Sequence, residues 1–148
     1  KLSAVEDKSG SIIPKIKVSE NAAKITNPHF KKVYRLFEKD GKAIADYICL
    51  YDEILDPSVP LELFDPVETW KRKTLTDYTC RELLVPIFRG GKLVYQCPGI
   101  EEMRAWCAAE LDLMWDEVKR FDNPHNYYVD LSQKLWNMKQ DLLQKAGR

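Results

Sequence analysis

Hydrophobic and polar positions alternate in short runs along the first two thirds of the chain, and this period of two residues predicts β-strands. Such runs, rich in β-branched and aromatic residues, cover residues 2–5, 12–18, 32–37 and 43–50. Asp40-Gly41 lies between the last two runs, and Gly90-Gly91 divides residues 84–96 in the same way. Because glycine adopts the positive φ that tight turns need, both segments are predicted to be β-hairpins.

Three prolines, Pro57, Pro60 and Pro66, interrupt the pattern between these hairpins. Proline cannot donate a hydrogen bond to a strand ladder. Residues 56–66 are therefore predicted to be a surface connection with at most a short edge strand at 61–64.

After Pro98 the period changes to three or four residues, which predicts helices. The first stripe ends before Pro124 and consists of Ile100, Met103, Cys107, Leu111, Met114, Val118 and Phe121. A D-x-x-Q capping pattern at Asp130 and Gln133 opens a second helix, which ends at Gly147 and has the stripe Leu131, Leu135, Met138 and Leu142. We expect the two helices to pack antiparallel and to bury their Met and Trp side chains.

The predicted fold class is α+β. An antiparallel, β-rich segment with hairpins, residues 1–97, precedes a C-terminal helical hairpin, residues 98–148. With 148 residues, 45% of them hydrophobic, the chain can build one core.

The composition of the chain bears on its cellular location. No apolar run approaches the roughly 20 residues that cross a bilayer, and no signal-peptide pattern opens the chain, so we expect a cytoplasmic protein without membrane contact. The chain begins at Lys1 and not at Met, which indicates a piece of a longer protein. Four cysteines without the paired spacing of zinc sites are predicted to be buried thiols: Cys49, Cys80, Cys97 and Cys107.

No nucleotide-binding, serine-hydrolase, zinc-protease or EF-hand motif occurs in the sequence. His29 and His125 each neighbour a proline in loop-like sequence, where histidine is more often a hydrogen-bonding loop residue than a base. The residues therefore supply no catalytic constellation.

The charges are segregated although they sum to zero, and residues 14–35 hold six basic residues against the single acid Glu20. Lysines beside a turn can reach a diphosphate as mobile point charges, with Ser19 or Thr26 as neutral donors. Alternatively, the lysines bind no ligand and only form the solvent-exposed face of a half-buried strand, since alternation places Lys15 and Lys17 on one face. Nucleic-acid binding is disfavoured, because few aromatic residues stand among the charges.

Several uncommon words occur in one order along nearly the whole chain: PKIKVSENAAKITNP, GKAIADYICL, LELFDPVETWKRKTL, RELLVPIFRGGKLVY and NPHNYYVDLSQKLW. Together they resemble the C-terminal portion of bacterial nicotinate phosphoribosyltransferases. Two positions depart from the family pattern. His29 stands where the family more often has Gly, and Gly99 stands where a Ser more often caps the helix.

This resemblance implies an enzyme that makes nicotinate mononucleotide and pyrophosphate from nicotinate and phosphoribosyl pyrophosphate, with ATP and magnesium. It also implies that a catalytic barrel and a second subunit complete the active site, so the isolated chain is expected to be inactive. Lys1 matches the K-L word at the barrel exit and Lys24 matches the lysine of the E-N-x-x-K-x-T word, which implies contacts with the phosphate groups. Lys17 and Ser19 accompany them as candidates.

Two other functions remain open from the residues themselves. The chain could be an independent interaction module whose terminal helices bind a partner. It could also be a phosphate- or nucleic-acid-binding domain that uses the early basic segment, in which case binding would depend steeply on salt.

Overall fold

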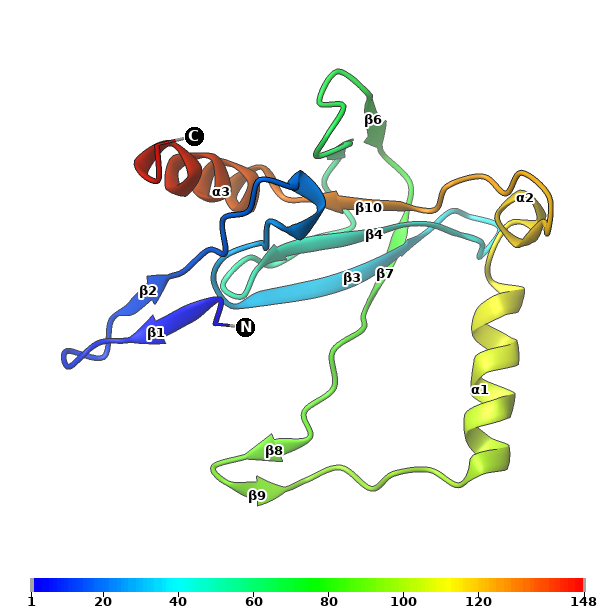
Figure 1. The fold of residues 1–148 in the computed structure, drawn as a ribbon. Helices are drawn as coiled ribbons and strands as arrows, with labels where there is room; N and C mark the ends of the chain where they lie inside the picture. The colour runs from blue at the N-terminus through cyan, green and yellow to red at the C-terminus, as the bar shows by residue number, and fades with distance from the viewer. Residues whose placement is uncertain (1, 148) are drawn as a thin grey trace.

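A four-stranded sheet forms the centre of the molecule in the computed structural model, which describes residues 2–147 (Figure 1). The strand order is β10-β4-β3-β7. Strands β3 (Lys31–Phe37) and β4 (Ala43–Leu50) form an antiparallel hairpin, and β7 (Thr79–Glu82) pairs antiparallel with β3. Strand β10 (Tyr128–Leu131) pairs parallel with β4 on the other side.

Three two-stranded antiparallel ribbons and the helices surround this sheet. The ribbons are β1 (Ala4–Glu6) with β2 (Ile12–Pro14), β5 (Leu61–Phe64) with β6 (Arg72–Leu75), and β8 (Phe88–Arg89) with β9 (Lys92–Leu93). The helices are the 3-10 turn η1 (Ala22–Lys24), α1 (Ile100–Asp112), α2 (Asp116–Lys119) and α3 (Gln133–Lys145).

Both hairpins predicted from glycine-containing turns are present. Gly41 has a φ of 80° in the β3–β4 connection, and Gly90 and Gly91 have φ values of 53° and 75° between β8 and β9. The edge strand predicted at residues 61–64 is β5, and its partner β6 begins within the basic run after Trp70. By contrast, the predicted strand at 12–18 stops at Pro14, and residues 15–19 lie outside any ladder.

The core lies on one face of the central sheet. Tyr34 and Leu36 of β3 pack there against alternate residues of β4 and against side chains from the β5–β6 ribbon. A smaller cluster of Leu50, Leu131 and Leu135 joins α3 to β4 and β10. Leu36 and Leu135 are fully buried, and each such side chain contributes roughly 1.5–3 kcal/mol to folding.

The α+β fold class, with antiparallel strands first and helices last, is confirmed, but the helices do not form the predicted hairpin. Figure 1 shows α1 and α3 at opposite ends of the sheet. The reason is β10, which lies between them in sequence and enters the sheet beside β4. Asp130, predicted to begin the second helix, is a strand residue, and Ser132 caps α3 by accepting a hydrogen bond from the backbone N–H of Leu135.

The first helical stripe also differs from its prediction. Helix α1 ends at Asp112, and Trp115 precedes the separate short helix α2. Helix α1 has no buried residue, and Trp106 is 62% exposed. The apolar side chains of this stripe are therefore not part of the core. They form a face of α1 that residues 2–147 leave uncovered.

Burial of the cysteines follows the prediction only in part. Cys49 is buried in β4, and burial raises the pKa of its thiol to about 11. Cys97 and Cys107 are exposed, because both belong to the uncovered segment around α1. Across residues 2–147, no helix combines the length and the apolar character that a membrane crossing needs.

Candidate functional site

The basic segment folds into a loop that two hydrogen bonds close at its base. The N–H of Lys17 donates to the Thr26 hydroxyl at 2.9 Å, and the N–H of Thr26 donates to the Lys17 carbonyl at 3.4 Å. At the tip, Asn21 accepts from the N–H of Ala23 at 3.0 Å and so caps η1. The Thr26 hydroxyl oxygen is thus part of the loop's own structure.

This loop brings together three of the four residues proposed to contact phosphate. Lys24 is the last residue of η1 and is exposed, Lys17 is exposed at the loop base, and Ser19 is half-buried between them in the sequence. No ion pair involves Lys17 or Lys24 within residues 2–147, so acids of this chain leave both ammonium charges uncompensated. Lys1, the fourth candidate, lies outside the described residues.

Lys31 has a structural role at the end of the basic segment. Its ammonium group donates to the carbonyls of Asn27 and Pro28, each at 3.1 Å, and to that of His29. Burial lowers the pKa of this lysine. The contacts hold a turn in which His29 has a φ of 66°, the left-handed conformation that glycine adopts most easily. His29, which stands where the resemblance implies glycine, therefore occupies a position where a side chain is strained.

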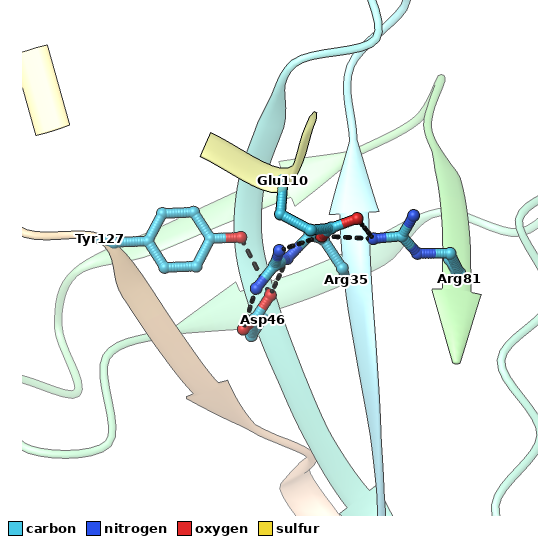
Figure 2. A network of polar contacts seen from close by, with 5 residues as sticks. All are labelled: Arg35, Asp46, Arg81, Glu110 and Tyr127. Atoms are coloured by element: carbon cyan, nitrogen blue, oxygen red, sulfur yellow. Dashed lines mark hydrogen bonds and ion pairs between the residues drawn. The ribbon is translucent and has the colours of Figure 1, made fainter. Parts of the chain in front are cut away.

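A second polar cluster, which the sequence did not reveal, lies on the sheet face opposite the core (Figure 2). Arg35 pairs with Asp46 through two hydrogen bonds of 2.8 and 3.1 Å, and Tyr127 donates its hydroxyl to Asp46 at 2.9 Å. From helix α1, Glu110 accepts from Arg35 at 2.8 Å and from Arg81 at 2.8 and 2.6 Å. Hydrogen bonding to Asp46 raises the pKa of Arg35 above its ordinary value.

This network is electrically balanced, because two guanidinium groups meet two carboxylates. Arg81 is further held between the rings of Phe37 and Trp106, with its guanidinium carbon 5.5 Å from each ring centre. Because its opposite charges pair with one another, the cluster fastens α1 to the sheet and leaves no net charge for a ligand.

A cleft of about 1230 Å³ opens between the β5–β6 ribbon and the segment that leads into β10. Its wall includes Asp65, Trp70, His125 and Tyr128, and Asp130 lines it from β10. Neither the cleft nor its lining was predicted, since its two walls are about 60 residues apart in sequence.

Comparison with known proteins decides the family. A sequence profile described as the nicotinate phosphoribosyltransferase C-terminal domain matches residues 30–139, which cover the whole central sheet. This chain belongs to that family. The predicted resemblance to nicotinate phosphoribosyltransferases is thereby confirmed.

Individual members of the family agree in sequence and in structure. The Bacillus subtilis (strain 168) nicotinate phosphoribosyltransferase is 39% identical over 140 residues, which are 94% of this chain and 28% of the relative. The Caenorhabditis elegans nicotinate phosphoribosyltransferase is 31% identical over 125 residues, 83% of this chain and 22% of the relative. The crystal structure of human nicotinic acid phosphoribosyltransferase superposes with a TM-score of 0.71 at 25% identity, over 80% of this chain and 24% of that one.

The chain therefore spans about a quarter of the length of the relatives that it matches. The basic loop at residues 17–26 lies before the matched family region, whereas the ion-pair network and the cleft lie within it.

Proposed function

We propose that this chain is the C-terminal domain of a cytoplasmic enzyme that joins nicotinate to phosphoribosyl pyrophosphate in NAD salvage. The reaction forms the bond between the pyridine nitrogen and ribose C1 and breaks the bond from C1 to pyrophosphate, with ATP hydrolysis as the driving step. The observation that carries this proposal is the family match over residues 30–139, together with relatives that are named for this activity.

The part of the enzyme beyond this chain is proposed to hold the reacting groups. No group of three or more His, Cys, Asp or Glu residues able to hold a metal occurs within residues 2–147. The residues described therefore do not fit a magnesium site, and we derive no step through magnesium or ATP in this chain. A catalytic barrel and a second subunit are the proposed partners.

The contribution of this chain to the chemistry is proposed to be electrostatic. Pyrophosphate gains negative charge as its bond to C1 breaks, and a lysine near it stabilises that charge more in the transition state than before. Lys24 and Lys17 suit this role because both are exposed on one loop without an ion pair to an acid of residues 2–147. Lys1 and Ser19 are proposed as further contacts.

The exposed stripe of α1 supports the proposal that this chain works as part of a larger polypeptide. Apolar side chains on the β8–β9 ribbon are exposed as well, and Phe88 is 65% accessible to solvent. An apolar surface of this kind is typical of an interface.

A chimaera tests the proposed function. In it, this chain replaces the matching segment of the Bacillus subtilis relative, to which it is 39% identical. We expect the chimaera to form nicotinate mononucleotide from nicotinate, phosphoribosyl pyrophosphate and magnesium ATP, while the purified 148-residue chain forms none. Turnover by the isolated chain, or a folded chimaera without turnover, would contradict the proposal.

A further inference from the structure

Asp130 is the one strongly buried carboxylate that lines the cleft between the β5–β6 ribbon and β10. Only 5% of the residue is exposed. Its backbone stands opposite Tyr47 in the β10–β4 ladder, so its side chain leaves the sheet on the same face as the core residue Tyr47.

No donor within residues 2–147 satisfies this carboxylate, because neither a hydrogen bond nor an ion pair reaches it. A buried carboxylate without a partner is costly, since it loses water and gains nothing in return. Burial, and after it the charge of Asp65, raises the pKa of Asp130 to about 6.

The cations around the cleft are already engaged elsewhere. Lys71 pairs with Glu68, Arg72 pairs with Glu62, and Lys73 pairs with Glu38 at 3.2 Å. Asp65 is also satisfied, because it accepts from the N–H groups of Val67 and Glu68 at 2.7 and 2.8 Å. Asp130 is therefore the carboxylate of the cleft that has neither a hydrogen bond nor an ion pair within residues 2–147.

The residues that line the cleft favour a planar organic cation over a metal ion. No three-residue metal-ligand group occurs in the described part of the chain. Trp70, Trp115 and Tyr128 line the cleft, and Trp70 is 72% exposed. A guanidinium group can pair with a carboxylate through two hydrogen bonds while it stacks on an aromatic face.

We propose that the Asp130 cleft receives an arginine side chain from the part of the enzyme that lies outside this chain. The inference rests on the proposed function, in which the relatives' further length, about four times that of this chain, is the source of such a partner. The positive guanidinium would neutralise the carboxylate of Asp130. It would also dock the β5–β6 ribbon and β10 onto the remainder of the enzyme.

The first test uses the 148-residue chain with N-acetyl-arginine amide as the probe, followed by the carboxyl ¹³C resonance of Asp130 in NMR. We expect saturable shifts with the arginine amide and at least tenfold weaker shifts with N-acetyl-citrulline amide, which has the same shape without the charge. Equal shifts with both amides, or displacement of the arginine amide by an equal concentration of MgCl₂, would overturn the proposal.

Two variants control this measurement. Because the Asp130 resonance is lost in Asp130→Asn, binding is then followed by the indole N–H resonance of Trp70, and we expect at least tenfold weaker binding. Asp52→Asn removes an exposed acid that does not line the cleft and should bind the amide as the original chain does. Unchanged binding by Asp130→Asn would rule out the proposed pair.

The second test separates an arginine of the enzyme from a free ligand. In the chimaera with the Bacillus subtilis relative, the cleft should already be occupied, so the arginine amide should cause no shift at Asp130. A persistent shift would mean that the cleft takes a free cation, and the proposed partner would be wrong. Nicotinate mononucleotide formation by the same chimaera is measured separately, so failure of this inference is distinguishable from failure of the proposed function.

Discussion

Arg35 and Asp46 lie directly opposite each other on β3 and β4, and their side chains pair through bonds of 2.8 Å from Nε and 3.1 Å from Nη2. The pair uses one side of the guanidinium. The other side is left for Glu110, whose carboxylate is 2.8 Å from Nη1. A contact inside one hairpin thus becomes the anchor for a helix 75 residues further along the chain.

Glu110→Ala should loosen α1. The substitution removes the acceptor of Arg35 and Arg81, and the Glu110 side chain is only 19% exposed, so we expect a loss of about 1–3 kcal/mol in urea unfolding. Amide hydrogen exchange should rise most along α1. Glu101→Ala, which breaks the exposed pair with Arg104 on the same helix, should change stability by less than about 0.5 kcal/mol. Equal effects of the two substitutions would show that the network does not hold the helix.

His29→Gly should stabilise the chain. The left-handed conformation of His29 costs a residue with a side chain about 1–2 kcal/mol, which glycine would not lose. Because glycine has more conformational freedom in the unfolded state, part of this gain is offset, and we expect a net stabilisation of about 0.5–1 kcal/mol. Asn123→Gly is the matched control. Asn123 has a φ of 48°, and asparagine tolerates this conformation better, so the gain there should be smaller. Thermal unfolding measures both. Destabilisation by His29→Gly would mean that its ring contact with Phe30 outweighs the strain.

Local signals predicted β3, β4 and the two glycine-containing hairpins, because each depended on residues close in sequence, whereas β6, β7 and β10 were not predicted. Alternation around Asp40-Gly41 predicts β3 and β4, but a bulge between Leu36 and Phe37 shifts the register so that Arg35 lies opposite Asp46. Counting back from the turn without the bulge would place Arg35 opposite Ala45, so the sequence does not reveal the pair. The approach of Glu110 is hidden as well, since nothing local to α1 specifies where the helix docks.

The helical third of the chain shows why hydrophobic periodicity alone does not predict which helix faces are buried or where a helix begins. The same stripe pattern predicts a buried face whether the covering surface belongs to this chain or to another, so the exposure of Trp106 was not foreseeable. Asp130 and Gln133 imitate a cap, so the pattern predicts a helix start at Asp130, which is a residue of β10. Pairing with β4 overrode that signal through a ladder that connects residues about 83 positions apart. The cleft around Asp130 depends on this same ladder and was missed with it.

The isolated chain should self-associate through the exposed apolar side chains of α1 and the β8–β9 ribbon. Contiguous apolar surface of more than a few hundred Å² is uncommon on monomeric proteins. We expect light scattering to show a mass above that of the monomer that rises with concentration, and the double substitution Phe88→Asp with Trp106→Asp to return it toward the monomer. Val67→Asp alters a more exposed apolar residue outside this surface and should leave association unchanged. A monomer at all concentrations would contradict the prediction.

Asp130 should make stability fall as the pH rises from 4 to 7. Its pKa in the folded chain, about 6, lies above the ordinary value of 3.8, so the folded state binds the proton more tightly than the unfolded state. The resulting stabilisation is complete below pH 3.8 and is lost as the pH passes 6, by roughly 3 kcal/mol for a shift of about two units.

Urea unfolding of the original chain and of Asp130→Asn between pH 4 and 7.5 isolates this effect. The other charged groups that line the cleft are present in both proteins, so the difference reports the titration of Asp130 together with its coupling to them: Asp65, Glu68, Lys71, Arg72, Lys73 and His125. We expect the difference in unfolding free energy to change by up to about 3 kcal/mol across the range. A constant difference would show that Asp130 has an ordinary pKa in the folded chain.

Lys24→Ala should lower kcat of the chimaera with the Bacillus subtilis relative. KM for phosphoribosyl pyrophosphate should rise by a smaller factor than that by which kcat falls. The reason is that a lysine near the leaving pyrophosphate acts mainly on the charge that develops in the transition state, and loss of one such contact costs about 2–4 kcal/mol of activation free energy. Steady-state kinetics with varied phosphoribosyl pyrophosphate measure both parameters. Lys15→Ala removes an exposed lysine of the same basic segment, outside the loop at residues 17–26, and should leave them unchanged. Arginine at position 24 keeps the charge and should recover part of the rate. Equal kinetics for Lys24→Ala and Lys15→Ala would show that the uncompensated charge of Lys24 does not act on pyrophosphate.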